Sequence, residues 1–435
     1  MKSNIKFRKI LNDLKKQPSD AAKDLKISIN QINQILNGKI EITDKLIHKA
    51  IKIWPINYSD FYIVKDDTKN NYLIFRNQKA NNSERTMFRG GVPYYSYKDT
   101  VMSKISPFKP ELIEELMVIN DDNPNNKKVK FNNGHFLHQF TYFIGPVNFY
   151  YEINKKKYVS KMNTGDTMYI SPYIKHSFTT RLNSKNVYGK ILALTFSDVI
   201  TNDVLNEILV LGYEKTRKFK TNINDEYQSF WANLDYHLNI LSLSLDKLKK
   251  FTGINFNKIK SNMRMPSYTQ IKKLSNSLNI NVRNLIPPLK RKEVEILDYK
   301  NCRQWFYTSL KDKIYSIKEL ASCNLLPMAK SIELTVLKKN KHNSFFRIPS
   351  HQYVYNIGDT KINVILDNNK KDYLNPGDSL YLKPNSKHLF FRKGKLLISR
   401  INGNLSSDSL YQISSFSDEN LKKVINDNRP WFYKK

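Results

Sequence analysis

The chain has few cysteines, a deficit of acidic residues and no long apolar stretch. Its two cysteines, Cys302 and Cys323, are too few for a disulfide framework or for a metal site built from thiolates. The N-terminal residues lack the apolar segment of a secretory signal, and no apolar run approaches the length that crosses a membrane. We therefore expect a soluble, cytoplasmic protein with no membrane partner.

Acidic residues are outnumbered by basic residues, 39 to 72, which gives a formal net charge of +33. Such a charge attracts polyanions, so nucleic acid has to be considered as a partner. The lysines are scattered rather than clustered, so compositional bias or a small anionic substrate explains the charge equally well. What the chain does have is a 12% aromatic content within a hydrophobic fraction of 40%, which is typical of a folded, strand-rich protein.

Two stretches of the chain repeat one another. Residues 163–179 (NTGDTMYISPYIKHSFT) align without a gap to residues 375–391 (NPGDSLYLKPNSKHLFF). The matched pairs are Gly165 and Gly377, Asp166 and Asp378, Tyr169 and Tyr381, Pro172 and Pro384, Lys175 and Lys387, and His176 and His388. A second motif recurs as His138-Gln139 with Ile144-Gly145 and as His351-Gln352 with Ile357-Gly358. Matched spacing over two separate motifs predicts a tandem duplication.

The repeated pattern Gly-Asp-x5-Pro-x3-His resembles the second motif of the cupins, double-sheet β-barrels whose interior commonly holds a divalent metal. Its histidine, His176, is expected to point into the barrel. Alternate residues of a strand face the same side, so His135 and Gln139 share one face while His138 faces the other. His135, Gln139 and His176 can therefore converge on one ion, and neutral imidazole suits iron, zinc, copper or nickel.

The carboxylate that usually completes an iron site with two histidines is missing. Leu137 stands two residues after His135, and Ile170 stands six residues before His176. Asp166 is expected to form the hairpin turn instead. A ligand set without a carboxylate leaves the site about one charge more positive, which favours a dianionic substrate.

The second copy of the motif is incomplete. It keeps Gln352 and His388 but has Ile348 where His135 falls. One imidazole is therefore absent, and we expect this copy to be structural, with residual metal binding as the alternative.

Helical patterns precede both repeated regions. Residues 4–64 carry apolar residues at helical spacing and resemble a helix-turn-helix domain, and residues 245–288 show a similar pattern. In the first of these, Asn30, Gln31 and Asn33 are placed to contact bases. Such bundles also serve as packing or oligomerisation modules, so the pattern alone leaves both interpretations open.

At 435 residues the chain is too long for one core and should form about two to four units. We predict an α+β fold, a tandem repeat of an all-helical, helix-turn-helix-like bundle and a double-stranded β-helix (cupin) barrel. The predicted domains are a helical domain at 1–64, a catalytic barrel at 65–200, connecting helices with a second helix-turn-helix-like domain at 201–290, and a second, degenerate barrel at 291–435.

Further motifs extend the resemblance over nearly the whole chain. Arg89 opens an Arg-x-Gly stretch with Tyr97 eight residues on, followed by Asn-Asn-Gly-His at 132–135 and the cupin motif. In this order they resemble the family of hydroxyethylphosphonate dioxygenases and methylphosphonate synthases. In the dioxygenase branch a glutamate takes the place of Ile170, whereas the synthase branch is expected to use a glutamine at the position of Gln139. With Gln139 present and Ile170 in place of the glutamate, the chain resembles the synthase branch at both positions.

The resemblance implies a non-haem Fe(II) enzyme that cleaves 2-hydroxyethylphosphonate with O2 to give methylphosphonate and CO2, without 2-oxoglutarate or NAD(P)H. The dioxygenase branch, the nearest alternative, would give hydroxymethylphosphonate and formate. The implied metal ligands are His135, Gln139 and His176, and the implied substrate-binding or catalytic residues are Arg89, Tyr97, Asn132 and Lys16. The lysine, or Lys15 if the alignment slips by one, would come from a neighbouring subunit of a homo-oligomer.

Two other classes of protein compete with this interpretation. A helix-turn-helix DNA-binding regulator with a cupin sensor would explain the charge and the helical motifs. It does not need Arg89, Tyr97 and Asn132 together, so nucleic acid is not the partner we expect. A different cupin metalloenzyme, an isomerase or a zinc hydrolase, would need a general base, and none is evident in the sequence.

Overall fold

The computed structural model describes residues 3–181, 187–197, 200–287, 292–307, 313–338, 345–405 and 407–426. The fold is a mixed α+β fold that divides into two compact units. Unit 1 comprises Met1–Leu73, Met102–Ser106 and Leu405–Lys435, and unit 2 comprises Ile74–Val101 and Pro107–Asn404. Within the described parts of the chain, no helix is both long enough and apolar enough to span a bilayer.

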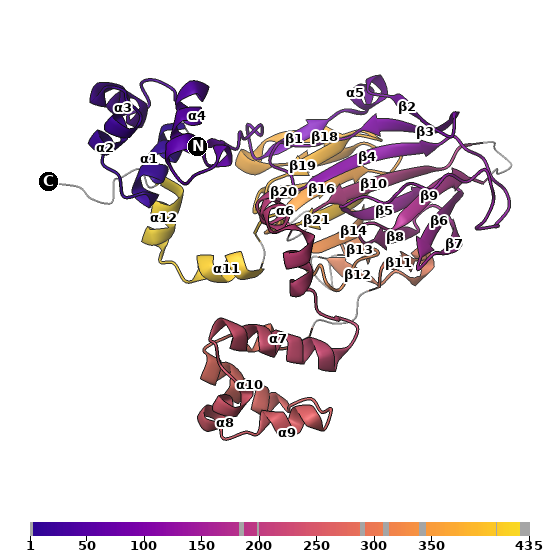
Figure 1. The fold of residues 1–435 in the computed structure, drawn as a ribbon. Coiled ribbons are helices and arrows are strands. Elements are labelled where there is room, and N and C mark those ends of the chain that lie inside the picture. Colours follow the sequence, from indigo (N-terminus) through magenta and orange to yellow (C-terminus); the bar gives the residue numbers. More distant parts are fainter. Residues whose placement is uncertain are drawn as a thin grey trace. The chain divides into compact units, whose positions relative to one another are not determined.

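Unit 1 is helical, and its first helices are drawn in indigo in Figure 1. Its helices are α1 (Ser3–Asp13), α2 (Pro18–Asp24), α3 (Ile29–Leu36), α4 (Asp44–Ile53), the 3-10 helix η1 (Tyr58–Phe61), α11 (Ser407–Ser414) and α12 (Asp418–Asn426). The hydroxyl of Ser28 caps α3 and that of Thr43 caps α4, each accepting from a backbone N–H of the first turn. The apolar faces meet in a core that includes the fully buried Phe7, Leu25 and Ile32. The helical prediction for residues 4–64 is confirmed.

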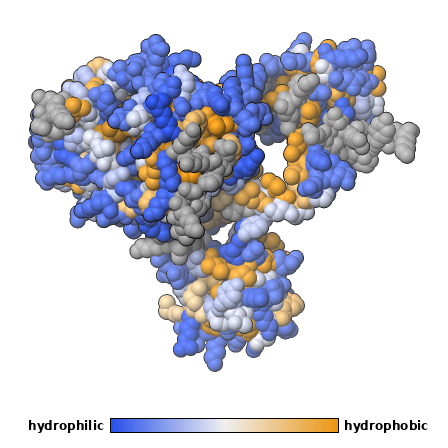
Figure 2. Space-filling view, turned by 180° about the vertical axis from the view of Figure 1, so that it is seen from behind, coloured by the Kyte–Doolittle hydropathy of each residue, from blue (hydrophilic) through white to orange (hydrophobic). Residues whose placement is uncertain are grey.

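Unit 2 also contains helices. They are α5 (Asn77–Asn82), α6 (Asn202–Thr216), η2 (Arg217–Phe219), α7 (Glu226–Ile240), α8 (Leu245–Thr252), α9 (Phe256–Ser261), α10 (Tyr268–Leu278), η3 (Val282–Asn284), η4 (Tyr299–Asn301) and η5 (Asp367–Asn369). Helices α7, α8, α9 and α10 share one core around Phe230, Leu248 and Phe256. In Figure 2 hydrophobic and hydrophilic side chains both reach the surface of this helical part, and Ile240 and Phe251 are among the exposed apolar ones.

The first set of strands forms two facing sheets. They are β2 (Arg85–Arg89), β3 (Val92–Asp99), β4 (Phe108–Glu115), β5 (His138–Ile144), β6 (Val147–Ile153), β7 (Lys156–Met162), β8 (Thr167–Ile170), β9 (Lys175–Thr180), β10 (Lys190–Phe196) and β11 (Val294–Leu297). One sheet has the order β11-β8-β5-β10-β4-β3-β2, and the other has the order β7-β6-β9. The fully buried Phe143, Phe149 and Met168 belong to the core of this set, which we call the first barrel.

The second set of strands, the second barrel, is built in a similar way. Its strands are β1 (Tyr72–Phe75), β12 (Gln304–Tyr307), β13 (Tyr315–Glu319), β14 (Ala329–Val336), β15 (Phe346–Arg347), β16 (His351–Asn356), β17 (Ile362–Ile365), β18 (Lys371–Leu374), β19 (Ser379–Leu382), β20 (Lys387–Phe391) and β21 (Gly394–Ile401). One sheet has the order β1-β19-β16-β21-β14-β13-β12, and the other has the order β15-β20-β17-β18. The larger sheets of the two barrels are drawn close together in Figure 1.

The two barrels exchange strands: the segment that precedes each barrel in sequence pairs with the other barrel. Strand β11, which precedes the second barrel in sequence, pairs with β8 of the first, and β1 pairs with β19 of the second. The Gly-Asp turns secure both exchanges: Asp166 accepts from the backbone N–H of Tyr299 at 2.8 Å, and Asp378 accepts from that of Asn77 at 2.8 Å. Asp166 also accepts from the N–H of Asn163 at 2.7 Å, so the aspartate forms the hairpin turn as predicted.

Candidate metal centre

The three predicted ligands come together inside the first barrel. The rings of His135 and His176 lie edge to face with centroids 5.3 Å apart, and His135 Nε2 is 3.1 Å from Gln139 Oε1. His176 comes from β9 of the smaller sheet, whereas Gln139 comes from β5 of the larger one. His138, by contrast, packs between the rings of Tyr169 and Phe196, with its Nδ1 2.7 Å from the Tyr169 hydroxyl. His138 therefore packs on the side of β5 opposite to Gln139, as the alternation of strand residues predicts.

The strand argument that placed His135 was wrong in its reason, although the side chain does reach Gln139. Strand β5 begins only at His138, and the backbone bends at residues 136 and 137. The position of His135 depends on Gly134, whose φ is +74° and whose added Cβ would lie 2.6 Å from the backbone of Tyr173. Only glycine permits this approach, and the N–H of Tyr173 then donates to the carbonyl of His135 at 2.8 Å.

Hydrogen bonds fix the tautomer of both histidines. Nδ1 of His135 lies 2.8 Å from the carbonyl oxygen of Leu137, and Nδ1 of His176 lies 2.8 Å from that of Ile174. A carbonyl can only accept, so in each ring Nδ1 carries the hydrogen and Nε2 presents its lone pair. This backbone support of the distal nitrogen is the usual arrangement of a metal-binding imidazole.

The amide of Gln139 is oriented in the same sense. Its Nε2 donates to Thr141 Oγ1 at 2.9 Å, which turns Oε1 toward His135 Nε2. Two lone-pair atoms then face each other at 3.1 Å, an arrangement that repels unless a cation lies between them. The donor set of His135, Gln139 and His176 therefore fits a divalent metal ion.

No carboxylate joins this set. Across the described residues no group of three His, Cys, Asp or Glu side chains is placed to hold a metal ion. Ile170, at the position where an acid would be expected, is buried and lies directly opposite Gln139 in the pairing of β5 with β8. Burial lowers the pKa of His176 to about 3, so its imidazole is neutral and available as a ligand.

Asn132 presents an amide donor at the edge of the centre. Its Oδ1 accepts from the backbone N–H groups of His176 at 2.8 Å and Gly134 at 3.1 Å. These bonds fix the amide so that Nδ2 lies 3.0 Å from His176 Nε2. Given the tautomer of His176, Nδ2 donates to its Nε2. A metal ion that took this lone pair would leave the Asn132 N–H able to donate to a ligand atom bound beside His176.

Arg89 and Tyr97 lie on the neighbouring strands β2 and β3. The guanidinium of Arg89 sits 4.6 Å above the ring of Tyr95 and donates to the carbonyl of Lys130 at 2.9 Å. The positive charge of Arg89 contributes to the lowered pKa of His176, so the guanidinium is close enough to influence groups at the candidate metal centre. The ring of Tyr97 meets that of Tyr95 edge-on at 6.0 Å, and burial raises the pKa of the Tyr97 phenol, which stays protonated.

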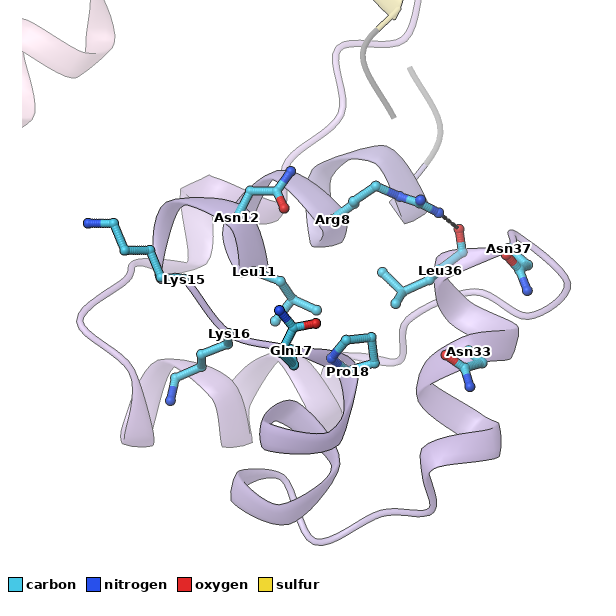
Figure 3. Close-up of a pocket in the computed structure, with 10 residues that line it drawn as sticks. All are labelled: Arg8, Leu11, Asn12, Lys15, Lys16, Gln17, Pro18, Asn33, Leu36 and Asn37. Atoms are coloured by element: carbon cyan, nitrogen blue, oxygen red, sulfur yellow. Dashed lines mark hydrogen bonds between the residues drawn. The ribbon is translucent and has the colours of Figure 1, made fainter. Parts of the chain in front are cut away.

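Lys16, the remaining predicted residue, belongs to unit 1. Its Nζ is 2.8 Å from Asp24 Oδ2 and 5.9 Å from the centroid of the Trp54 ring. It lines a cavity of about 230 Å³ whose other lining residues are Arg8, Leu11, Asn12, Lys15, Gln17, Pro18, Asn33, Leu36 and Asn37. Figure 3 shows Lys15 and Lys16 pointing away from Arg8 across this pocket.

One buried acid in the first barrel was missed by the sequence analysis. Glu115 on β4 is fully buried opposite Tyr95, and within the described part of the chain neither of its carboxylate oxygens has a hydrogen-bond partner. Burial raises the pKa of Glu115 well above its usual value, with Arg89 as the opposing positive charge. Ile113 and Glu115 are two residues apart and therefore share one face of β4, and this spacing is the signal in the sequence that could have pointed to the acid.

The second barrel has the incomplete set that the sequence indicated. The N–H of Asn385 donates to the carbonyl of Ile348 at 2.7 Å, which matches the bond from Tyr173 to His135 and confirms that Ile348 stands in the place of His135. Gln352 and His388 are both fully buried. Arg400, which the sequence motifs did not indicate, donates from Nε to Gln352 Oε1 at 3.2 Å.

Comparison with known proteins gives the family. No family model matches the chain. The methylphosphonate synthase of Nitrosopumilus maritimus (strain SCM1) is 40% identical over 440 residues, covering 99% of this chain and 96% of the relative. A Streptomyces albus HEPD, solved with 2-hydroxyethylphosphonate and Fe(II), superposes with a TM-score of 0.93 at 28% identity, covering 99% of this chain and 98% of that one.

A more distant structure, PhpD with cadmium atoms, has a TM-score of 0.76 at 15% identity over 97% of this chain and 99% of its own, and it supports the fold alone. The relative from Nitrosopumilus maritimus carries more weight, because 40% identity extends over almost the full length of both chains. The chain therefore belongs to the methylphosphonate synthase family.

Proposed function

We propose that the chain converts 2-hydroxyethylphosphonate and O2 to methylphosphonate, CO2 and water by cleavage of the carbon–carbon bond. The neutral set of two imidazoles and one amide oxygen, with Ile170 in place of an acid, is the observation that carries the proposal. Two findings support it: a full-length relative is a methylphosphonate synthase, and a solved structure 28% identical to this chain holds 2-hydroxyethylphosphonate and Fe(II). The reaction balances without a further reductant, so neither 2-oxoglutarate nor NAD(P)H is required.

The residues that would hold Fe(II) are His135, Gln139 and His176, through Nε2, Oε1 and Nε2. When bound, the iron would supply the redox chemistry with O2 and a coordination site for the substrate oxygens. Because the three ligands are neutral, the site keeps the full charge of the ion, and a phosphonate dianion offsets it.

Arg89 and Asn132 are the residues we assign to the phosphonate group, with Tyr97 as a protonated donor. A guanidinium pairs with two oxygens of a phosphonate, and the amide Nδ2 of Asn132 is already aimed at the ligand side of His176. We further propose that Lys16 of a neighbouring subunit completes this site in a homo-oligomer. Lys16 is then a residue of unit 1 that acts outside its own unit.

The duplication predicted from the motifs remains our proposal for the architecture, with the domains at 1–64, 65–200, 201–290 and 291–435. The corresponding strand orders of the two larger sheets support it. So do the bonds from His138 to the Tyr169 hydroxyl and from His351 to the Tyr381 hydroxyl, both 2.7 Å long. Such agreement between matched residues is expected if one ancestral unit was copied.

Phosphorus NMR after anaerobic loading tests the function directly. Purified protein is loaded with Fe(II), then given 2-hydroxyethylphosphonate and O2. Methylphosphonate as the product supports the proposal. Hydroxymethylphosphonate would assign the chain to the dioxygenase reaction, and unchanged substrate would reject both reactions.

DNA binding is the second candidate, and a specific observation favours it. Asn30, Gln31 and Asn33 are exposed on α3, as a base-reading helix requires. A salt-dependent mobility shift with duplex DNA would support this role for the bundle, and its absence at low salt would reject it.

A further inference from the structure

The interior of the second barrel carries a positive charge at the position that corresponds to the metal centre. Arg400 on β21 lies directly opposite Gln352 on β16, as Thr195 on β10 lies opposite Gln139 on β5. Its Nε donates to Gln352 Oε1, and among the described residues no carboxylate forms an ion pair with its guanidinium. The second barrel therefore has one imidazole fewer than the first, and it places the positively charged side chain of Arg400 at the corresponding position.

Gln352 and His388 each also present one unpaired nitrogen atom at this place. Gln352 and His388 are fully buried, and Nε2 of each has no hydrogen-bond partner among the described residues. Nδ1 of His388 lies 2.9 Å from the carbonyl of Ser386, so Nδ1 carries the hydrogen and Nε2 presents a lone pair. The interior thus offers a charged donor, an amide donor and one acceptor.

A metal ion does not fit this set, because the guanidinium repels it and Ile348 supplies no ligand. An oxyanion does fit it. A guanidinium pairs with two oxygens of a phosphate or carboxylate, and a free amide N–H can serve another oxygen. The lone pair of His388 Nε2 would repel a fully deprotonated oxygen but accepts a hydrogen bond from an O–H group.

We propose that the second barrel binds a small phosphate-like oxyanion that keeps an O–H group, with Arg400 and Gln352 donating to its oxygens and His388 accepting from the O–H. Hydrogen phosphate and a hydrogen phosphonate share this chemistry. Burial lowers the pKa of Arg400 to about 10, against an opposing effect of Tyr307, so an anion bound beside the guanidinium would favour its charged form. The ring of Phe346, stacked on His388 at 5.4 Å, walls one side.

Calorimetric titration with inorganic phosphate and with sulfate tests the site. The protein is the full chain carrying Arg89→Gln, which weakens anion binding in the first barrel. We expect one phosphate per chain, and sulfate, which has no O–H at neutral pH, at least about tenfold weaker. Adding Arg400→Gln should weaken phosphate at least about tenfold, whereas adding Arg347→Gln, an exposed arginine of the same barrel, should change nothing.

A second variant separates the acceptor from the charge and covers a failure of Arg400→Gln to fold. His388→Leu should remove the preference for phosphate over sulfate, because the variant lacks the acceptor that distinguishes an O–H group from a deprotonated oxygen. Phosphate binding that does not saturate, or that survives Arg400→Gln, would overturn the proposal. Equal affinity for sulfate and phosphate would also overturn it, because the O–H would then have no role. The same titration with methylphosphonate, at a pH at which it keeps its O–H group, gives a second affinity. Comparing it with the affinity for phosphate shows whether the site prefers a phosphonate or a phosphate.

Discussion

At the scale of single residues, the proposed metal centre depends on the orientation of one amide. Gln139 can offer the metal an oxygen or a nitrogen, and only the oxygen has a lone pair to give. The bond from its Nε2 to Thr141 Oγ1 decides between them. The hydroxyl of Thr141 therefore orients the amide of Gln139 without being a metal ligand itself.

Thr141→Val should weaken metal binding, because the amide of Gln139 is then free to rotate. Loss of a partner behind a metal ligand typically costs about 10–100-fold in affinity. Titration with Fe(II) under anaerobic conditions measures the change. Thr195→Val, at the half-buried threonine opposite Gln139, is the matched control and should have little effect. Equal affinities for the two variants would contradict the role of Thr141.

Gln139→Glu restores a carboxylate to the site. The added negative charge reduces the attraction for the dianionic substrate and should change the product ratio, the turnover, or both. Phosphorus NMR of methylphosphonate and hydroxymethylphosphonate measures this. Unchanged turnover with an unchanged product ratio would remove Gln139 from the set of ligands.

Glu115 predicts how stability depends on pH. Its pKa is raised in the folded chain, so the native state holds a proton that the unfolded state releases above about pH 4.3. Stability from this group is complete below that pH and is lost as the pH rises toward the folded pKa. Glu115→Gln keeps the shape without the ionisation, so it should stabilise the protein at pH 8 by about 1–3 kcal/mol and do little at pH 4. Thermal unfolding at both pH values tests this, and a gain that is the same at both would be inconsistent with it.

At the scale of elements, the loop before β5 places His135, the first of the proposed ligands. This loop is not regular structure, and Gly134 lets it pass against the backbone of Tyr173. The left-handed conformation and the close contact act together at this glycine, whereas at Gly91 only the first is present. The two glycines therefore form a natural pair for comparison.

Gly134→Ala should destabilise the fold by about 1–3 kcal/mol through strain and should also displace His135. Gly91→Ala, with φ +80° and no atom within 4 Å of the added Cβ, should cost only about 1 kcal/mol and leave metal affinity unchanged. Urea unfolding and metal titration give the two readouts. A normal metal affinity in Gly134→Ala would show that the loop tolerates the extra carbon.

At the scale of the whole molecule, the two barrels hold each other through exchanged strands. Arg76, just after β1, donates to Asp378 at 2.9 Å and to Asp372 at 2.7 Å, so one side chain ties the leading segment of the first barrel to the second. Asp378 is nearly fully buried, whereas Arg76 is only partly buried. Because water still reaches the guanidinium, loss of this ion pair should cost less stability than loss of a fully buried pair.

Arg76→Gln should lower the stability of unit 2 by about 1–3 kcal/mol, since Asp378 loses its charged partner. Because each barrel is closed by a strand of the other, both should still unfold in one transition. Differential scanning calorimetry distinguishes a single shifted peak from two peaks. Separate peaks would mean that the exchanged strands do not couple the barrels. Arg85→Gln, which removes a more exposed pair with Asp99 and Glu111, is the control.

Local sequence patterns determined the helices of residues 4–64, the repeated barrel motifs and the identity of the two histidines. These depend on spacing along the chain, and spacing is visible in a sequence. Strand alternation was an incorrect reason for placing His135 beside Gln139, because His135 lies before the strand, although the two side chains do meet.

Only the tertiary structure decided what surrounds these residues. Glu115 and Arg400 lie in strands whose sequences do not say which charged side chain will be enclosed, since that depends on the sheet that covers them. The exchange of β1 and β11 between the barrels depends on contacts between residues far apart in sequence. The bond from Asn77 to Asp378 spans 301 residues, and the bond from Tyr299 to Asp166 spans 133. The sequence by itself determined which groups could bind a metal, and the fold decided how their lone pairs are aimed, because hydrogen bonds to Leu137, Ile174 and Thr141 exist only after the chain has folded.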